Sequence, residues 1–316
     1  MRTKNIRLAI FAAAALLLGA CSDDDLKDES IFKADLEQVA QMSEFDQWLD
    51  KNYRETYNIN FKYRYIDNES DRSYNVIPAD YAKSKALAIL VKHMWLDVYT
   101  ELLDTVFLRT YAPRIIQLTG SFQYQANDSG ESGGIVLGTA EGGIKVMLYG
   151  VNSLDPENIY VNTVDPYSPA RFSTELLDLN HWFFHTMHHE FCHILTQKKE
   201  YSTDFRTISA DSYYATDWIN ITDKKAAGDG FVTGYAGKEY NEDFAEIYST
   251  YVTMSADAWA AIEKQAGEKG LPILRNKLKL LRDYFKNSWN LDIDKVREVV
   301  LRRSQEAQSL DLSILN

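Results

Sequence analysis

The chain has 316 residues, of which 46 are Asp or Glu and 34 are Lys or Arg, so its formal net charge is −12. This acidic balance repels phosphate backbones and excludes nucleic acid as a partner. The apolar and charged fractions of 45% and 25% are those of a globular protein, and two cysteines are too few for a disulfide framework.

The N-terminus predicts an export signal that is removed. Three basic residues precede an apolar run from Leu8 to Leu18, which is too short to span a bilayer. The following Gly19-Ala20-Cys21 resembles a bacterial lipobox, in which the cysteine is lipidated and becomes the new N-terminus. We predict a signal peptide over residues 1–20 and a lipid anchor on Cys21. The alternative is an ordinary secretory signal followed by a chance cysteine.

Residues 21–33 are predicted to be an acidic tether, because their composition cannot bury enough apolar area to fold. Removal of residues 1–20 deletes three basic groups and no acidic ones, which changes the net charge from −12 to −15. Acidic residues behind a lipidated cysteine resemble the surface-export signal of some Gram-negative lipoproteins. We therefore expect attachment to the outer membrane, facing the exterior. A solvated spacer on the periplasmic side is the alternative.

The first half of the folded region predicts helices and strands in alternation. Residues 43–53 are predicted to form a helix that Ser43 can cap. In 58–66, apolar and polar residues alternate, which predicts a strand with one solvent-exposed face. Pro78 opens a long helix with a buried stripe made of Leu87, Leu90, Val91, Met94 and Val98. Strands follow at 115–124 and 135–151, the second broken by a turn at Gly142-Gly143, and 127–134 reads as a loop.

The second half predicts mainly helices. A helix covers about 179–198, residues 199–240 are irregular, and helices resume at Asn241 and continue to the end. Strands first and helices later indicate an α+β domain over 34–316, with a mixed or antiparallel sheet lobe, a helical lobe and a cleft between them.

The predicted helix at 179–198 carries His189-Glu190-Phe191-Cys192-His193. Residues four apart share one face of a helix, so His189 and His193 can bind one metal through two imidazoles. Glu190 lies beside them, where it can reach an activated water but cannot be the third ligand. This is the His-Glu-x-x-His arrangement of zinc hydrolases, and it predicts one Zn²⁺ per chain.

The third ligand must be an acid, because no histidine follows His193. Thr196 and Lys199 occupy the positions where the three-histidine class has its Gly and its last ligand. The segment 241–246 offers a second helix that Asn241 can cap, with Glu242 and Glu246 one turn apart on one face. Glu242 could instead be a helix-start charge, and the other candidate ligands are Glu246, Glu239, Asp217 and Asp211.

The spacing of Tyr235 and the Glu242-Asp243-Phe244-Ala245-Glu246 helix resembles the second half of the catalytic domain of anthrax lethal factor. With the lipobox and the histidine motif, the chain resembles the substrate-import-associated zinc metallohydrolase lipoproteins. That family implies a zincin-like metallopeptidase linked to a TonB-dependent transporter and its binding lipoprotein. Cys192 departs from the family's usual small residue, and we expect it to behave as a small hydrophobe.

The resemblance also implies roles for individual residues. Glu242 is the third zinc ligand, Glu246 is a carboxylate that supports the ligands, and Tyr235 donates to the developing oxyanion. Tyr235 is one of 20 tyrosines, and Tyr240, Tyr213 or Tyr214 could serve instead.

The remaining histidines are predicted to be structural: His93, His181, His185 and His188. His185 is also placed to line the cleft or to orient Glu242, because it lies one turn before His189. The predicted activity is hydrolysis of a peptide by zinc-activated water with Glu190 as general base. An extended substrate would pair with 144–151 as an edge strand.

Two other functions are compatible with the same sequence features. One is hydrolysis of an amide in a glycopeptide or cell-wall fragment. The other is a nutrient-binding lipoprotein that docks on a transporter and has lost catalysis, against which an intact Glu190 argues.

Overall fold

A computed structural model describes residues 42–65, 76–126, 132–136, 138–141 and 144–315. The predicted signal peptide, Cys21 and the tether lie outside these ranges, as does the predicted turn at Gly142-Gly143. The described residues from Gln47 onward belong to one compact unit. The helices of the described ranges include none with the apolar length needed to cross a bilayer.

The chain enters its described part through α3 (Glu44–Leu49), which continues as a π-helical turn, η1 (Asp50–Glu55). Ser43 Oγ accepts a hydrogen bond from the backbone N–H of Asp46 at 3.1 Å, which confirms the predicted cap. Tyr53 is fully buried, and its hydroxyl donates to the carbonyl of Ala88 at 2.5 Å.

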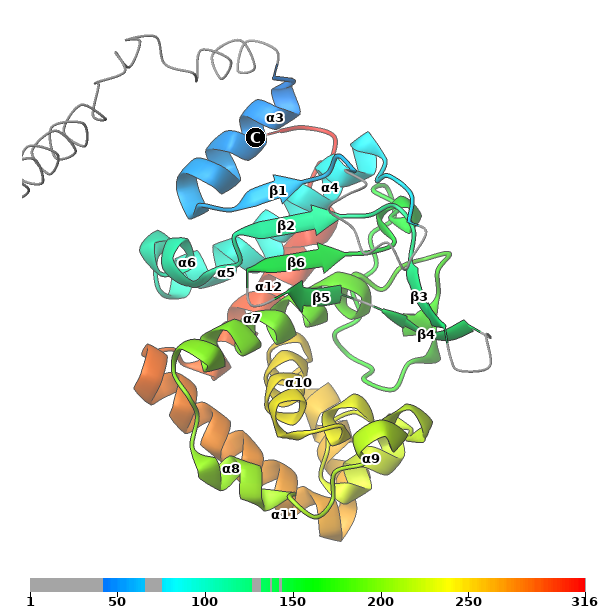
Figure 1. Cartoon of the computed structure of the whole chain (residues 1–316), viewed down its shortest axis with the longest axis vertical. Coiled ribbons are helices and arrows are strands. Elements are labelled where there is room, and N and C mark those ends of the chain that lie inside the picture. Colours follow the sequence, from blue (N-terminus) through cyan, green and yellow to red (C-terminus); the bar gives the residue numbers. More distant parts are fainter. Residues whose placement is uncertain (1–41, 66–75, 127–131, 137, 142–143, 316) are drawn as a thin grey trace, which may run out of the picture. The chain divides into compact units, whose positions relative to one another are not determined.

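A mixed four-stranded sheet has the order β1–β2–β6–β5 (Figure 1). β1 (Asn60–Lys62) pairs parallel with β2 (Ile115–Leu118), and β2 pairs parallel with β6 (Lys145–Leu148). β5 (Gly138–Glu141) pairs antiparallel with β6, with Glu141 opposite Lys145. This agrees with the predicted α+β class and its mixed sheet.

Two strand predictions need correction. The strand predicted at 115–124 is divided between β2 and β3 (Gln123–Ala126), because the backbone packs tightly at Gly120. A Cβ on Gly120 would meet the carbonyl oxygen of Pro78 at 2.2 Å, and Gly120 N–H donates to Ile77 at 2.8 Å. The loop predicted at 127–134 is also partly wrong, since β4 (Ser132–Val136) pairs antiparallel with β3 in a second sheet.

The predicted edge strand 144–151 is an interior strand. The chain folds back so that β5 covers the side of β6 that β2 leaves open. In the described sheet the free edge next to the helical part therefore belongs to β5. It lies beside α7 (His185–Lys198), which Figure 1 shows passing beneath it.

One long helical segment lies between β1 and β2 in the chain. It runs through α4 (Tyr81–Val91), the π-helical η3 (Lys92–Leu96) and α5 (Asp97–Leu102). The predicted stripe is buried: Leu87, Leu90, Val91, Met94 and Val98 are at most 1% exposed. The helix begins at Tyr81 rather than at Pro78, because the side chain of Asp80 accepts from Lys83 N–H at 3.0 Å and caps it.

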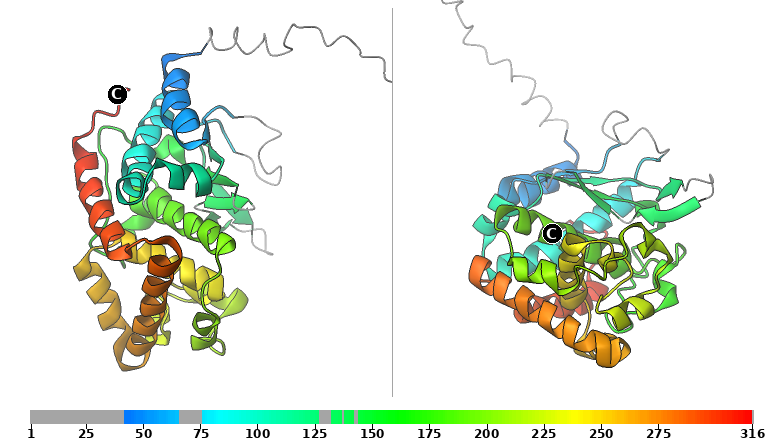
Figure 2. Two further views of the ribbon diagram at one scale, coloured as in Figure 1. Left: turned by 90° about the vertical axis from the view of Figure 1, so that its left-hand side faces the viewer. Right: turned by 60° about the horizontal axis from the view of Figure 1, so that its bottom comes forward.

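Helices dominate after β6. η6 (Asn180–Phe184) leads into α7, which packs against α10 (Tyr240–Thr253). α11 (Ala256–Trp289) is kinked at Gly267, where φ is +61°, and packs on the helix α9 (Asp223–Asp229). α12 (Ile293–Glu306) contacts α10, α5 and η3 (Figures 1 and 2). The shorter segments are α6 (Thr105–Tyr111), η4 (Val151–Ser153), η5 (Pro169–Phe172), α8 (Thr203–Ile208), η7 (Ala215–Asn220), α9 (Asp223–Asp229), η8 (Tyr235–Gly237) and η9 (Ala307–Ser309). The region predicted as irregular thus contains short helices.

Candidate metal centre

Helix α7 carries the histidine motif on the face that meets α10. Met187, Phe191 and Ile194 are buried on the other face, so the hydrophobic side of α7 fixes which way the histidines point. Phe191 packs edge-on against Trp95 and Tyr99 of the long helical segment, at ring-centroid distances of 5.3 and 4.9 Å. Cys192 is fully buried, as predicted for a small hydrophobe.

The structure brings His189, His193 and Glu242 together. The two Nε2 atoms are 3.0 Å apart, and Glu242 Oε2 lies 3.2 Å from Nε2 of His189 and 3.1 Å from Nε2 of His193. These three ligand atoms converge from α7 and α10, which are separated by more than 40 residues in sequence. The predicted third acid therefore lies beside the two imidazoles.

The spacing of these atoms fits one tetrahedral zinc ion. Ligand bonds of about 2.0–2.1 Å place neighbouring ligands about 3.3 Å apart in such a site. The observed separations of 3.0–3.2 Å are close to that value. Two imidazole nitrogens and one carboxylate oxygen are also a donor set that zinc favours.

A second cluster surrounds Glu246, which is buried one turn after Glu242. Its Oε1 lies 2.8 Å from Nδ1 of His189 and 2.9 Å from Nε2 of His185, while its Oε2 accepts from the Thr233 hydroxyl at 2.6 Å. His189 thus faces Glu242 with one ring nitrogen and Glu246 with the other. His185 contacts Glu246, not Glu242 as the sequence suggested.

Electrostatics link the two clusters. Burial lowers the pKa of His189, but the carboxylates of Glu242 and Glu246 outweigh burial and raise that pKa to about 10. Burial alone would raise the pKa of Glu242, yet hydrogen bonds from His189, His193 and Lys238 bring it well below its usual range. A cation bound here must therefore compete with protons.

Glu190 differs from the other two glutamates. None of the described residues donates a hydrogen bond to its carboxylate or forms an ion pair with it. Burial raises its pKa above the ordinary value, and the charges of Glu242 and Glu246 act in the same direction against those of the histidines. A carboxylate with a raised pKa and no fixed partner is suited to accept and release a proton.

Tyr235 lies within the cluster, in η8. Its hydroxyl donates to Glu242 Oε1 at 2.8 Å, and its ring packs edge-on against Trp218 at 4.8 Å. Burial is the first cause that raises its pKa, followed by the charge of Glu242, so it remains a donor at neutral pH. Lys238 Nζ reaches the same Oε1 at 2.9 Å.

Among the other acids and tyrosines considered from sequence, Glu239, Tyr213, Tyr214 and Tyr240 make contacts of their own outside the cluster. Glu239 caps α10 by accepting from Asn241 N–H at 3.2 Å, so Asn241 is not the cap as predicted; the helix starts one residue earlier, at Tyr240. Within the described ranges, neither Asp211 nor Asp217 belongs to a possible metal cluster. Tyr213 and Tyr214 donate to Asp243 and Asp229, and the Tyr240 ring lies under Arg206.

Sequence reasoning missed Lys238 and Thr233. Lys238 precedes Glu242 by four residues, a spacing that pairs opposite charges along a helical turn, so charge patterning could have identified it. Thr233 had no such local signal, because it reaches Glu246 only through the tertiary fold.

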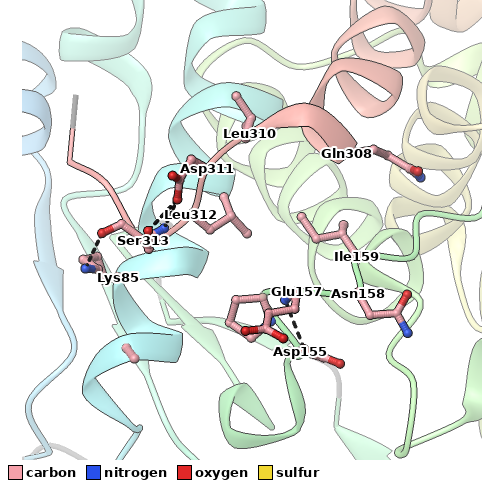
Figure 3. Close-up of a pocket in the computed structure, with 12 residues that line it drawn as sticks. Lys85, Asp155, Glu157, Asn158, Ile159, Gln308, Leu310, Asp311, Leu312 and Ser313 are labelled. Atoms are coloured by element: carbon pink, nitrogen blue, oxygen red, sulfur yellow. Dashed lines mark hydrogen bonds between the residues drawn. The ribbon is translucent and has the colours of Figure 1, made fainter.

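One hollow among the described residues has none of the site residues in its lining. It has a volume of about 800 Å³ and lies between the start of α4, residues 155–159 and the C-terminal segment 308–313 (Figure 3). Its walls carry Lys85, which donates to the Ser313 carbonyl at 2.7 Å, but none of the predicted site residues.

Comparison with known proteins agrees with the geometry of the cluster. The family described as "Putative zinc-binding metallo-peptidase" matches residues 38–294. A crystal structure titled as that of a "putative zinc-binding metallo-peptidase" from Bacteroides caccae is 39% identical, covers 87% of this chain and 98% of its own, and has a TM-score of 0.70. No protein of curated function matches. The zinc metallopeptidase family predicted from the sequence is confirmed.

Proposed function

The chain belongs to the "Putative zinc-binding metallo-peptidase" family, and on that premise we propose that it is a zinc-dependent peptidase with a single catalytic zinc. The observation that supports this most is the convergence of two imidazole nitrogens and one carboxylate oxygen within 3.0–3.2 Å. Beside them lies Glu190, whose carboxylate has no hydrogen-bond or ion-pair partner among the described residues.

We assign zinc to His189, His193 and Glu242. Zinc bound there would supply a Lewis acid that makes an attacking water acidic enough to ionise near neutral pH. Glu246 Oε1 lies 2.8 Å from Nδ1 of His189, so the other ring nitrogen, Nε2, is the one that faces the metal position. Such a carboxylate behind a zinc-bound histidine fixes the orientation of the ring and its tautomer.

Glu190 acts as the general base in this proposal. Its raised pKa and free carboxylate let it take a proton from the attacking water and deliver it to the leaving nitrogen. The Tyr235 hydroxyl is the donor to the oxygen that gains negative charge. A covalent intermediate is not required.

The substrate is proposed to bind as an extended strand along β5. This strand, rather than 144–151, is one of the two edge strands of the described sheet, and it contacts α7. Backbone pairing at a sheet edge holds a peptide without regard to sequence. We infer a zincin-like arrangement in which the site lies between the sheet lobe and the helical lobe.

A pair of variants tests the proposal. Glu190→Gln should retain zinc and lose at least about a hundredfold in kcat, since a general base contributes about 10²–10⁴. His189→Ala should lose zinc as well as activity. Glu200→Gln, on the exposed surface, is the control. Metal content by mass spectrometry and cleavage of a diverse peptide library, with and without chelator, give both readouts. A fully active Glu190→Gln protein would eliminate the assigned base, and cleavage of glycopeptide or cell-wall amides alone would change the substrate class.

A second pair of variants decides between the two clusters. If zinc lies at the Glu242 cluster, Glu242→Ala should lower zinc occupancy sharply, whereas His185→Ala should lower it little. The reverse result would move the metal to His185, His189 and Glu246.

The cellular setting is a further part of the proposal. We propose that Cys21 carries a lipid, that the protein faces the exterior on the outer membrane, and that it works beside a TonB-dependent transporter and its binding lipoprotein. Support comes from the lipobox-like sequence and the acidic residues after it. Protease treatment of intact cells should digest the protein, and survival of the protein there would favour the periplasmic side.

A further inference from the structure

Lys238 lies outside the histidine motif in sequence, but its side chain reaches the metal cluster. Its Nζ donates to Glu242 Oε1 at 2.9 Å and to the Tyr235 hydroxyl at 3.3 Å. The same Nζ lies 5.0 Å from the centroid of the Tyr235 ring. The three polar groups form one small network beside the metal-facing oxygen of Glu242.

The two oxygens of Glu242 have separate tasks. Oε2 faces the two imidazoles, whereas Oε1 accepts from both Tyr235 and Lys238. The Glu242 side chain is only 13% exposed, so water has limited access to it. A largely buried carboxylate oxygen that loses a hydrogen-bond donor is destabilised unless a second donor remains bound to it.

The Tyr235 hydroxyl points at Glu242 in this structure. To donate to a substrate oxygen it must leave Oε1, which is then kept by one partner, Lys238. Without that ammonium group, departure of the hydroxyl would leave Oε1 without either of the two donors that the described residues supply. Glu242 could then rotate Oε1 toward the metal or retain the tyrosine.

We propose that Lys238 is a positioning residue that holds Oε1 of Glu242, so that Oε2 stays directed at the zinc and the Tyr235 hydroxyl is released to the substrate. This inference rests on the proposed peptidase function and extends it. Lys238 acts through Glu242 and Tyr235, and it does not touch the reacting atoms. Its role is therefore seen in turnover and in metal affinity rather than in substrate binding.

The chain contains a matched control for this arrangement. Lys225 Nζ lies 3.1 Å from Asp229 Oδ2, four residues later, and Tyr214 donates to the same oxygen at 2.9 Å. Lys225 Nζ is 5.4 Å from the Tyr214 ring centroid. As around Lys238, a lysine and a tyrosine donate to one carboxylate, and Asp229 also accepts from Lys269 at 2.7 Å. Among the described residues no histidine contacts this carboxylate. Lys225→Met therefore removes a similar ion pair without touching the metal cluster.

The test compares Lys238→Met, Lys238→Arg and Lys225→Met with the wild-type protein, all loaded with zinc. Partners behind zinc ligands typically contribute about 10–100-fold to metal affinity or activity. We expect Lys238→Met to lower kcat by about tenfold or more, to leave KM within about twofold, and to weaken zinc retention against a chelator. Lys238→Arg should restore most of both, and Lys225→Met should match the wild type. Melting curves verify that each variant is folded.

The Tyr235→Phe background tests whether Lys238 acts through the tyrosine. There, Lys238→Met should lower kcat much less than in the wild-type background, since no hydroxyl remains to be released. An equal loss in both backgrounds, or a rise in KM alone, would overturn the positioning role, as would unchanged kcat and zinc retention in Lys238→Met. A wild-type protein that binds zinc and cleaves nothing would instead refute the proposed peptidase function. In that case the difference in zinc retention between Lys238→Met and the wild type would still test whether Lys238 positions Glu242.

Discussion

The buried ion pair between Lys277 and Asp243 allows a demanding prediction about stability. Both side chains are 0% exposed, and Lys277 Nζ lies 2.7 Å from Asp243 Oδ2. The same Nζ donates to the Gly230 carbonyl at 2.8 Å and lies 4.0 Å from the Phe231 ring centroid. We expect Lys277→Met to destabilise the protein far more than removal of any exposed lysine.

The magnitude follows from what the substitution leaves behind. Breaking a buried ion pair from one side costs about 3–5 kcal/mol, because the other charge stays buried without compensation. Asp243 would keep one donor, the Tyr213 hydroxyl at 2.9 Å, while its Oδ1 has no partner among the described residues. A loss of about 3–5 kcal/mol is a large part of the 5–15 kcal/mol that stabilises a typical domain.

Protonation limits this loss and makes it depend on pH. Burial raises the pKa of Asp243 to about 6 even though Lys277 and Tyr213 act against burial. Without Lys277 the pKa rises further, so the folded variant takes up a proton that the unfolded chain, with its ordinary pKa, does not hold. Stability then falls as pH increases until the folded carboxyl ionises. The deficit of Lys277→Met should therefore be larger at pH 8 than at pH 6.

Urea unfolding at both pH values, with saturating zinc, measures these differences. Lys277→Met combined with Asp243→Asn should recover at least about 2 kcal/mol of the single variant's loss, because no buried charge then remains. Lys279→Met is the control: its partner Asp283 is four residues away on an exposed surface, and the change should stay within about 0.5 kcal/mol. A loss below about 1 kcal/mol for Lys277→Met, or no recovery in the double variant, would refute the reasoning.

Three further predictions concern the metal centre and the helix that carries it. Glu246→Gln should weaken zinc binding by about 10–100-fold in a chelator competition, and unchanged affinity would show that Nδ1 of His189 needs no carboxylate. Zinc affinity should fall as pH is lowered from 8 to 6, because the Glu242 and Glu246 carboxylates favour the protonated form of His189 and zinc must displace that proton; affinity independent of pH would contradict this. His188 is fully buried, and burial lowers its pKa from 6.5 to about 3. The stability that the neutral, buried imidazole contributes is therefore complete above pH 6.5 and is lost as pH falls toward 3, because the unfolded chain takes up a proton that the folded chain does not. In urea unfolding, His188→Phe should remove about 1.4 kcal/mol per pH unit of the acid dependence, and parallel pH curves for variant and wild type would count against it.

Local patterns in the sequence predicted the elements that carry the chemistry. The stripe of α4 to α5, the amphipathic helix with His189 and His193, and the later helix with Glu242 depend on residues three and four positions apart. Such spacings are determined within one helix, so they can be recognised without knowledge of the rest of the chain. The zinc metallopeptidase family followed from the same short segments.

Helix boundaries and strand roles were less accessible. Asp80 and Glu239 cap their helices in place of the predicted starts at Pro78 and Asn241, because several neighbouring residues could each supply a cap. The segment 144–151 looked like an edge strand, but β5 folds back on it. The position of a strand within a sheet depends on which strands pair with it, and pairing partners are distant in sequence.

By itself, the sequence determined that two imidazoles and a neighbouring glutamate lie on one helix and that an acidic helix follows. Only the tertiary structure decided that Glu242 meets Nε2 of His189 while Glu246 meets Nδ1, and that Lys238 shares the outer oxygen of Glu242. The physical reason is that helical periodicity is a local property of the backbone. Contacts between α7 and α10 depend on how two buried faces pack, which no single segment specifies.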